Sequence, residues 1–221
     1  MSGTMTKFTE ADGGAEGYMV HVGGGKPGVV VLQEWWGLVP HVKDVTERFA
    51  KQGYTALSPD LYHGQSTVEA EEAQHLMEGL DWGRATKEIK AAVAYLRGQG
   101  CPKVGVVGFC MGGALAMLGA ATAGVDAAVS FYGFPPPPNP LDTKCPPTKI
   151  FFGSDEGFFS VPDAQAWAEG QRARGVADTE VVIYEGAGHA FFNDTRAEAY
   201  VQDAARDAWA KTLAHFKKHL G

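Results

Sequence analysis

A cysteine stands at the centre of a glycine-rich segment, because residues 108–113 read Gly-Phe-Cys-Met-Gly-Gly. Glycines two positions before and two positions after Cys110 fit the nucleophile elbow, a sharp strand-to-helix turn usually built around serine. The turn needs glycine because a Cβ there would clash with neighbouring backbone. A thiol at the start of the following helix lies near the positive end of the peptide dipoles, which favours the thiolate. The segment therefore predicts Cys110 as a nucleophile.

Two other interpretations fit parts of the same segment. Cys110 could be a small apolar residue buried in a tight turn, and the segment by itself leaves this open. A dinucleotide or phosphate loop fits poorly, because no G-x-G-x-x-G is in register and no Gly-Lys-Ser/Thr follows. The rest of the chain must decide between them.

A base and an acid follow Cys110 in the chain order that such elbows require. Two later apolar runs, 149–152 and 180–184, read as strands, and each is followed by polar and glycine residues. His189 comes after the second and is the predicted base, while Asp155 comes after the first and is the predicted acid that orients it. Glu156 is the alternative acid; Asp155 is preferred because the acid usually lies immediately past the strand. Asp155 could also be a loop-capping carboxylate.

Stabilising an oxyanion requires two preorganised donors. The backbone N–H of Met111, next to the nucleophile, is one candidate, and that of Trp35, after the valine-rich run 28–33, is the other. Glu34 stands out because a carboxylate at the end of a buried strand is costly unless it is paired. It could bond the Cys110 thiol and control its ionisation, or it could be a surface residue at the sheet edge.

The other histidines lack such a setting. His215 and His219 fall on the last helix and are expected to be solvated, while His41, His63 and His75 are expected at the surface or in caps. No pair shows zinc-ligand spacing together with a third ligand. The sequence predicts neither a metal site nor a cofactor.

Strands and helices alternate around these residues. Strands are predicted at 28–33, 54–57, 103–109, 127–132, 149–152 and 180–184, and helices at 42–52, 69–79, 85–97, 112–123, 164–174 and 201–220. This order predicts an α/β fold, a three-layer sandwich with a mostly parallel central sheet, and strand-to-helix loops meeting at one edge. One domain is expected over 1–221, with 1–14 a loose arm or an edge strand. Residues 134–147, with four prolines at 135–138, read as a stiff surface connection.

Composition limits the broad class. The 221 residues are 45% apolar and 20% charged, which excludes a disordered chain and a coiled coil. With 19 basic and 26 acidic side chains the net charge is −7, which argues against a nucleic-acid partner. No run approaches about 18 apolar residues, so no membrane span is predicted. Three cysteines do not make a disulfide framework, and a polar N-terminus lacks a secretory signal, so a cytoplasmic protein is expected.

Five segments together resemble the dienelactone hydrolase family. They are Gln-Glu-Trp-Trp-Gly at 33–37, Pro-Asp-Leu-Tyr at 59–62, the elbow at 108–113, Gly-Ser-Asp at 153–155 and Gly-Ala-Gly-His-Ala-Phe at 186–191. The resemblance implies an α/β-hydrolase without a large cap, with a Cys110–His189–Asp155 triad. It also implies that Glu34 pairs with the thiol at rest, and that a lactone or small ester is hydrolysed through an acyl-thioester. No cofactor or metal is implied.

Two departures from the family concern the substrate. Relatives that act on dienelactone carry an arginine four residues after the histidine, where this chain has Asn193, and another in the segment that matches 69–79, which here contains none. The substrate is therefore expected to lack a carboxylate. The predicted pocket is lined by Trp36, Phe134, Phe158, Phe159, Phe191 and Asn193. The rival functions are a non-catalytic or redox-sensing relative that binds a small ligand, and a thioesterase or peptidase.

Overall fold

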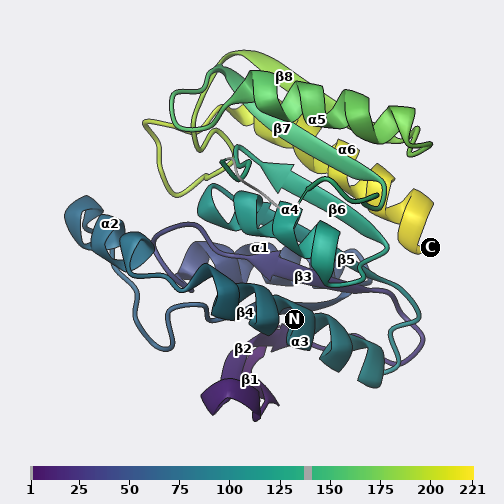
Figure 1. The fold of residues 1–221 in the computed structure, drawn as a ribbon. Coiled ribbons are helices and arrows are strands. Elements are labelled where there is room, and N and C mark those ends of the chain that lie inside the picture. Colours follow the sequence, from purple (N-terminus) through teal and green to yellow (C-terminus); the bar gives the residue numbers. More distant parts are fainter. Residues whose placement is uncertain (1, 137–140) are drawn as a thin grey trace.

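The computed structural model describes residues 2–136 and 141–221 of the chain. Within them, eight strands form one mixed sheet in the order β1-β2-β4-β3-β5-β6-β7-β8 (Figure 1). The strands are β1 (Thr4–Thr9), β2 (Ala15–Val20), β3 (Gly28–Leu32), β4 (Thr55–Pro59), β5 (Val104–Phe109), β6 (Ala127–Phe131), β7 (Thr148–Asp155) and β8 (Thr179–Gly188). From β4 to β8 all neighbours are parallel, as the alternating pattern predicted.

The N-terminal segment is part of this sheet. β1 pairs antiparallel with β2, which pairs antiparallel with β4, so the sheet is mixed. Of the two expectations for the first residues, the loose arm is wrong for Thr4–Thr9, which form an edge strand. A short 3₁₀ turn, η1 (Ala11–Gly13), joins β1 to β2.

Helices cover both faces of the sheet, which confirms the predicted three-layer α/β fold. They are α1 (Pro40–Lys51), α2 (Ala70–Glu78), α3 (Trp82–Gly98), α4 (Met111–Thr122), α5 (Val161–Ala173) and α6 (Gln202–Leu220). α1 and α6 share one face, where the Phe49 ring packs on Trp209 and Phe216 at centroid distances of 4.6 and 5.9 Å. α3, α4 and α5 lie on the opposite face (Figure 1).

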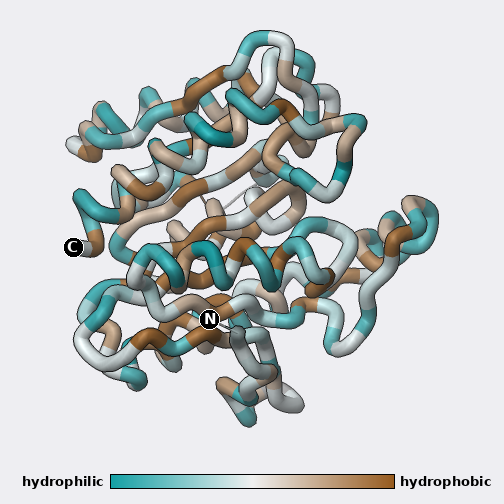
Figure 2. Tube along the Cα trace, turned by 180° about the vertical axis from the view of Figure 1, so that it is seen from behind, coloured by the Kyte–Doolittle hydropathy of each residue, from teal (hydrophilic) through white to brown (hydrophobic). Residues whose placement is uncertain are grey.

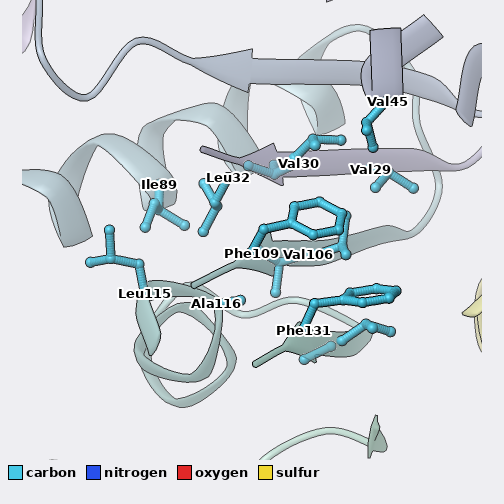
Figure 3. Packing of buried hydrophobic residues seen from close by; sticks show 14 of the residues in the cluster. Val29, Val30, Leu32, Val45, Ile89, Val106, Phe109, Leu115, Ala116 and Phe131 are labelled. Carbon is cyan, nitrogen blue, oxygen red and sulfur yellow. The ribbon is translucent and has the colours of Figure 1, made fainter. Parts of the chain in front are cut away.

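The core lies between the sheet and these helices. Val29, Val30 and Leu32 of β3 have no exposed surface, because a central parallel strand is covered on both sides. Figure 3 shows these side chains beside Phe109 and Phe131 of the neighbouring strands, with Leu115 and Ile89 of α4 and α3 nearby. In Figure 2 the brown, apolar segments run through the strands and the teal, polar ones along the outer helices. This packed centre makes the carboxyl edge of the sheet a rigid base for loops.

The predicted and observed elements differ mainly at their ends. β7 continues to Asp155 rather than ending at Phe152, and β8 continues to Gly188. Their ladder contains a register shift between Gly153 and Asp155, so the extension passes through an irregular pair. Part of the predicted proline-rich connection, residues 137–140, lies outside the described residues. In the described part of the chain, no helix combines the length and apolar character needed to cross a bilayer.

Candidate active site

Cys110 lies in the turn between β5, which ends at Phe109, and α4, which begins at Met111. Its backbone has φ 54° and ψ −119°, a conformation that costs a non-glycine residue free energy and is concentrated at functional sites. A Cβ on Gly108 would lie 1.9 Å from the carbonyl oxygen of Gly112, and one on Gly112 would lie 2.3 Å from that of Gln33. The glycines are therefore required by close backbone contact, as the elbow pattern predicted.

A third glycine supports the elbow and was not identified from the sequence. A Cβ on Gly133 would lie 2.2 Å from the carbonyl oxygen of Cys110 and 2.6 Å from the amide nitrogen of Ala114. Gly133 follows β6, so it approaches Cys110 only because β5 and β6 are neighbours in the sheet.

The carboxylate that contacts His189 is Glu156. Its Oε2 and Oε1 lie 2.9 and 3.1 Å from Nδ1 of His189, and its side chain has no exposed surface. Backbone N–H groups of Phe158 and Phe159 also donate to Oε1, at 2.8 and 3.3 Å, which holds the carboxylate in place.

Asp155, the predicted acid, is exposed, and its Oδ1 accepts a hydrogen bond from Ser154 Oγ. The expectation that Asp155 contacts His189 is therefore wrong. The physical reason is the length of β7: the strand includes Asp155, so the first residue past its end is Glu156. The principle that the acid immediately follows the strand holds, but the strand ends three residues later than predicted.

Aromatic rings surround the imidazole of His189. The ring centroids of Phe158, Phe159 and Tyr132 lie 4.6, 5.9 and 5.1 Å from that of His189. Phe158 is 74% exposed, so it covers the histidine from the solvent side without itself being buried. The rings of Phe158, Phe159 and Tyr132 thus pack around the imidazole whose Nδ1 meets Glu156.

Glu34 is buried, with 2% of its surface exposed, so the alternative of a surface residue is wrong. The Tyr132 hydroxyl donates to its Oε1 at 3.0 Å and Nδ2 of Asn193 donates to its Oε2 at 2.7 Å. Both partners offset the cost of burying a carboxylate. Tyr132 was missed as a site residue, although the predicted strand 127–132 already placed it at the same edge as Cys110.

The surroundings of Cys110 change the pKa of its thiol. Burial raises its pKa well above the ordinary value, and the negative charges of Glu34 and Glu156 raise it further. The backbone N–H groups of Met111 and Trp35 act in the opposite direction and lower the pKa, because they stabilise negative charge on the sulfur. The backbone N–H groups of both residues thus face the sulfur of Cys110. At neutral pH the resting thiol is protonated.

Removing the charge of Glu34 is expected to lower the pKa of Cys110. In Glu34→Gln the side chain keeps an acceptor for Tyr132 but loses the negative charge that opposes the thiolate. The rate of Cys110 alkylation by iodoacetamide, measured against pH, should therefore reach its midpoint at lower pH than in the wild type. Glu16→Gln, at an exposed position on β2, is the matched control and should not move the midpoint. An unchanged or raised midpoint in Glu34→Gln would exclude Glu34 as a control of thiol ionisation.

The predicted pocket residues separate into two groups. Trp36, Phe158 and Phe159 are at least partly accessible, and the guanidinium of Arg196 lies 5.0 Å from the Trp36 ring centroid. Phe134, Phe191 and Asn193 are buried, at no more than 4% exposure. Phe191 packs on Tyr132 and Tyr184, and Asn193 holds Glu34.

A cavity of about 280 Å³ lies elsewhere, between α2, α3 and the loop after β4. It is lined by Tyr62, His63, Arg84 and Glu88, among others, and neither Cys110 nor His189 borders it. One of its lining residues, Tyr62, reaches toward the site, because its hydroxyl lies 3.3 Å from the sulfur of Met111. We do not assign catalysis to this cavity, because no nucleophile with a paired base faces it.

Two of the remaining histidines are not where they were expected. His41 and His215 are both buried rather than at the surface or solvated. Burial lowers the pKa of each below the ordinary value for histidine. His215 lies near His219 and Asp178, far along the chain from Cys110.

Comparison with known proteins assigns the chain to a family. The sequence profile of the Dienelactone hydrolase family matches residues 16–220. The chain belongs to the dienelactone hydrolase family. This confirms the resemblance found in the five sequence segments, and the chain is accordingly a carboxylic ester hydrolase of the dienelactone hydrolase type, with the α/β-hydrolase fold.

Individual relatives match this dienelactone hydrolase family member over most of their length. It is 35% identical to protein usf of Aquifex pyrophilus over 99% of both chains. It is 34% identical to a carboxymethylenebutenolidase of Pseudomonas putida, covering 81% of this chain and 80% of that one. A Klebsiella pneumoniae structure assigned to the dienelactone hydrolases superimposes with a TM-score of 0.85 at 25% identity, covering 98% of both chains.

Proposed function

We propose that this protein hydrolyses small uncharged esters or lactones, with Cys110 as nucleophile, His189 as base and Glu156 as the acid that orients His189. The observation that carries the proposal is the contact between Oε2 of Glu156 and Nδ1 of His189, at 2.9 Å. Both residues lie at the sheet edge that also holds Cys110 with its positive φ. A ligand-binding relative without catalysis would have no need for a buried carboxylate paired with a histidine at this edge.

The first half-reaction acylates the thiol. The proton of Cys110 passes to Nε2 of His189, and Sγ forms a bond to the carbonyl carbon while the π electrons move onto the carbonyl oxygen. The N–H groups of Trp35 and Met111 stabilise that oxyanion. Collapse breaks the carbon–oxygen bond of the ester, and the leaving alkoxide takes the proton from His189. In a lactone the alkoxide stays attached, so the ring opens.

The second half-reaction releases the acid. A water gives a proton to His189 and its oxygen attacks the thioester carbon. The carbon–sulfur bond then breaks and the thiolate recovers the proton from His189. Glu156 stabilises the imidazolium that forms in both halves, because its carboxylate accepts a hydrogen bond from Nδ1–H.

Glu34 would keep the thiol inactive until substrate binds. Its negative charge raises the pKa of Cys110, so little thiolate forms in the free enzyme. A carbonyl oxygen entering between the N–H groups of Trp35 and Met111 would displace the sulfur toward His189. This agrees with the family resemblance, in which the matching glutamate pairs with the thiol at rest.

The charges near the site favour an uncharged substrate. Arg196 lies over Trp36, but its guanidinium is also ion-paired with Glu198 at 2.7 Å, which offsets its positive charge. Asn193, at the position where relatives acting on dienelactone carry arginine, is engaged with Glu34. The aromatic side chains of Trp36, Phe158 and Phe159 suit the apolar part of an ester.

Trapping the acyl-enzyme tests this proposal. Wild-type protein mixed with p-nitrophenyl acetate and quenched in acid within the first turnover should gain the mass of one acetyl group. Peptide mapping should place that group on Cys110. Cys145→Ala, which removes a buried thiol outside the site, should give the same adduct. Turnover with an adduct on another residue, or with no adduct at any quench time, would contradict the assignment.

A further inference from the structure

Three ligand-type side chains meet at the end of the last helix. His215 and His219 are one turn apart on α6, and Asp178 immediately precedes β8. One ligand atom from each lies within 4.8 Å of the other two. The amino ends of parallel strands lie at the edge opposite to the elbow, so this cluster is separate from Cys110. In Figure 1 the C-terminal end of α6 lies on the side where β6 begins.

His215 has a buried nitrogen without a partner. Only 2% of the residue is exposed, and Nε2 lies 3.1 Å from the carbonyl oxygen of Pro147, which can only accept a hydrogen bond. Nε2 therefore carries the hydrogen, and Nδ1 presents a lone pair. Among the described residues Nδ1 has no hydrogen-bond partner, although Oδ2 of Asp178 lies 3.9 Å away.

This arrangement calls for a cation between the two acceptors. With its hydrogen on Nε2, the imidazole presents the lone pair of Nδ1 toward Oδ2 of Asp178, at 3.9 Å. A neutral lone pair facing a carboxylate oxygen is unfavourable unless a positive ion lies between them. Histidines that bind metals are oriented in this way, with the other ring N–H donated to a backbone carbonyl.

The distances are close to those of a metal site. Bonds of about 2.0–2.2 Å from zinc to nitrogen or oxygen place tetrahedral ligand atoms about 3.3 Å apart. His215 Nδ1 and Asp178 Oδ2 are 3.9 Å apart, so this distance must shorten for both atoms to bind one ion. His219 Nε2 and Asp178 Oδ2 are 2.5 Å apart, so this distance must lengthen. The side chains of Asp178 and His219 are partly exposed and can make this small adjustment.

We propose that Asp178, His215 and His219 bind one divalent transition-metal ion, for which Zn²⁺ is the suitable probe. Water completes the coordination. The ion would join the end of α6 to the residue before β8, and its role would be structural, because the site lies at the edge opposite to Cys110. The expectation of no metal site rested on the missing third ligand, and Asp178 supplies it from 37 positions earlier in the chain than His215.

A variant of Lys218 tests whether the cluster binds a metal ion or is only an ion pair. Its Nζ lies 2.9 Å from Oδ2 of Asp178 and therefore occupies the carboxylate that the metal would use. If the cluster binds metal, Lys218→Gln should increase affinity for Zn²⁺ several-fold, because a competing positive charge is removed. If the cluster is only an ion pair, Lys218→Gln leaves Zn²⁺ binding absent.

The experiment uses protein without a polyhistidine tag, stripped with EDTA and dialysed. Zn²⁺ is then titrated by calorimetry and by competition with a chromophoric chelator. We expect one saturable site per chain, at least about tenfold weaker in His219→Ala and Asp178→Asn. His21→Ala, at an exposed histidine on the opposite half of the sheet, should match the wild type. Zn²⁺ should also raise the melting temperature of the wild type but not that of His219→Ala.

Binding in Cys110→Ala distinguishes the cluster from the active-site thiol, since thiolates also bind zinc. The site proposed here predicts unchanged affinity in that variant. The proposal fails if the wild type shows no saturable binding. It also fails if His219→Ala and Asp178→Asn, shown by circular dichroism to be folded, bind as tightly as the wild type.

Discussion

Cys110→Ala is expected to lower kcat/KM for p-nitrophenyl acetate by about 10⁴-fold or more. The variant is expected to keep the fold, because alanine is smaller than cysteine and its Cβ meets the same backbone conformation, with φ 54°, that cysteine already adopts. It loses the atom that forms the covalent bond, and what remains is rate enhancement by the oxyanion donors and by binding alone. Steady-state hydrolysis measured by release of p-nitrophenol, with a dienelactone as second substrate, checks this.

Two further thiols provide matched controls for Cys110. Cys101 and Cys145 are free and buried, and neither has a paired histidine and carboxylate beside it in the described structure. Cys101→Ala and Cys145→Ala should therefore change kcat/KM by less than about threefold. Equal activity of Cys110→Ala and the wild type would remove Cys110 as the nucleophile and favour the ligand-binding or redox-sensing alternative.

Glu156→Gln is expected to lower kcat by about 10²- to 10⁴-fold with little effect on KM. Glutamine has the same shape but no charge, so it neither selects the tautomer with hydrogen on Nδ1 nor stabilises the imidazolium. Because the side chain of Glu156 has no exposed surface and its Oε2 lies 2.9 Å from Nδ1 of His189, no water can readily replace it. The measurement is kcat and KM for the same ester over a range of pH.

Asp155→Asn is the matched variant, one residue away and equally isosteric. Asp155 is exposed, and its carboxylate accepts a hydrogen bond from Ser154 rather than contacting His189, so kcat should stay within about threefold of the wild type. If Asp155→Asn caused the larger loss, the orienting acid would be Asp155 and β7 would have to end differently during turnover. The pair therefore decides which carboxylate acts on His189.

The elbow is the part of the site that local sequence specifies best. Gly108 and Gly112 were identifiable because the contacts that require them come from the turn itself and from the strand beside it. Alternating apolar runs and amphipathic helices likewise predicted the parallel sheet, because a buried central strand must be apolar on both faces. The order of Cys110, the acid and His189 along the chain followed from the same pattern.

The choice between Asp155 and Glu156 depended on the tertiary structure. Where a strand ends is decided by its partner, and β7 continues to Asp155 because β8 pairs with it as far as Gly188. Each residue of extension changes which side chain comes first after the strand. A prediction based on the apolar run at 149–152 had no information about that pairing.

The sequence by itself therefore determined the fold class, the nucleophile candidate and the histidine, because these depend on local patterns of apolar residues and glycines. Only the tertiary structure decided the partners of the buried polar groups. Glu34 meets Tyr132 and Asn193, and His215 meets Pro147 and Asp178, across long separations in the chain. A buried polar atom must find a partner in space, and which partner it finds is set by the packing of the whole sheet.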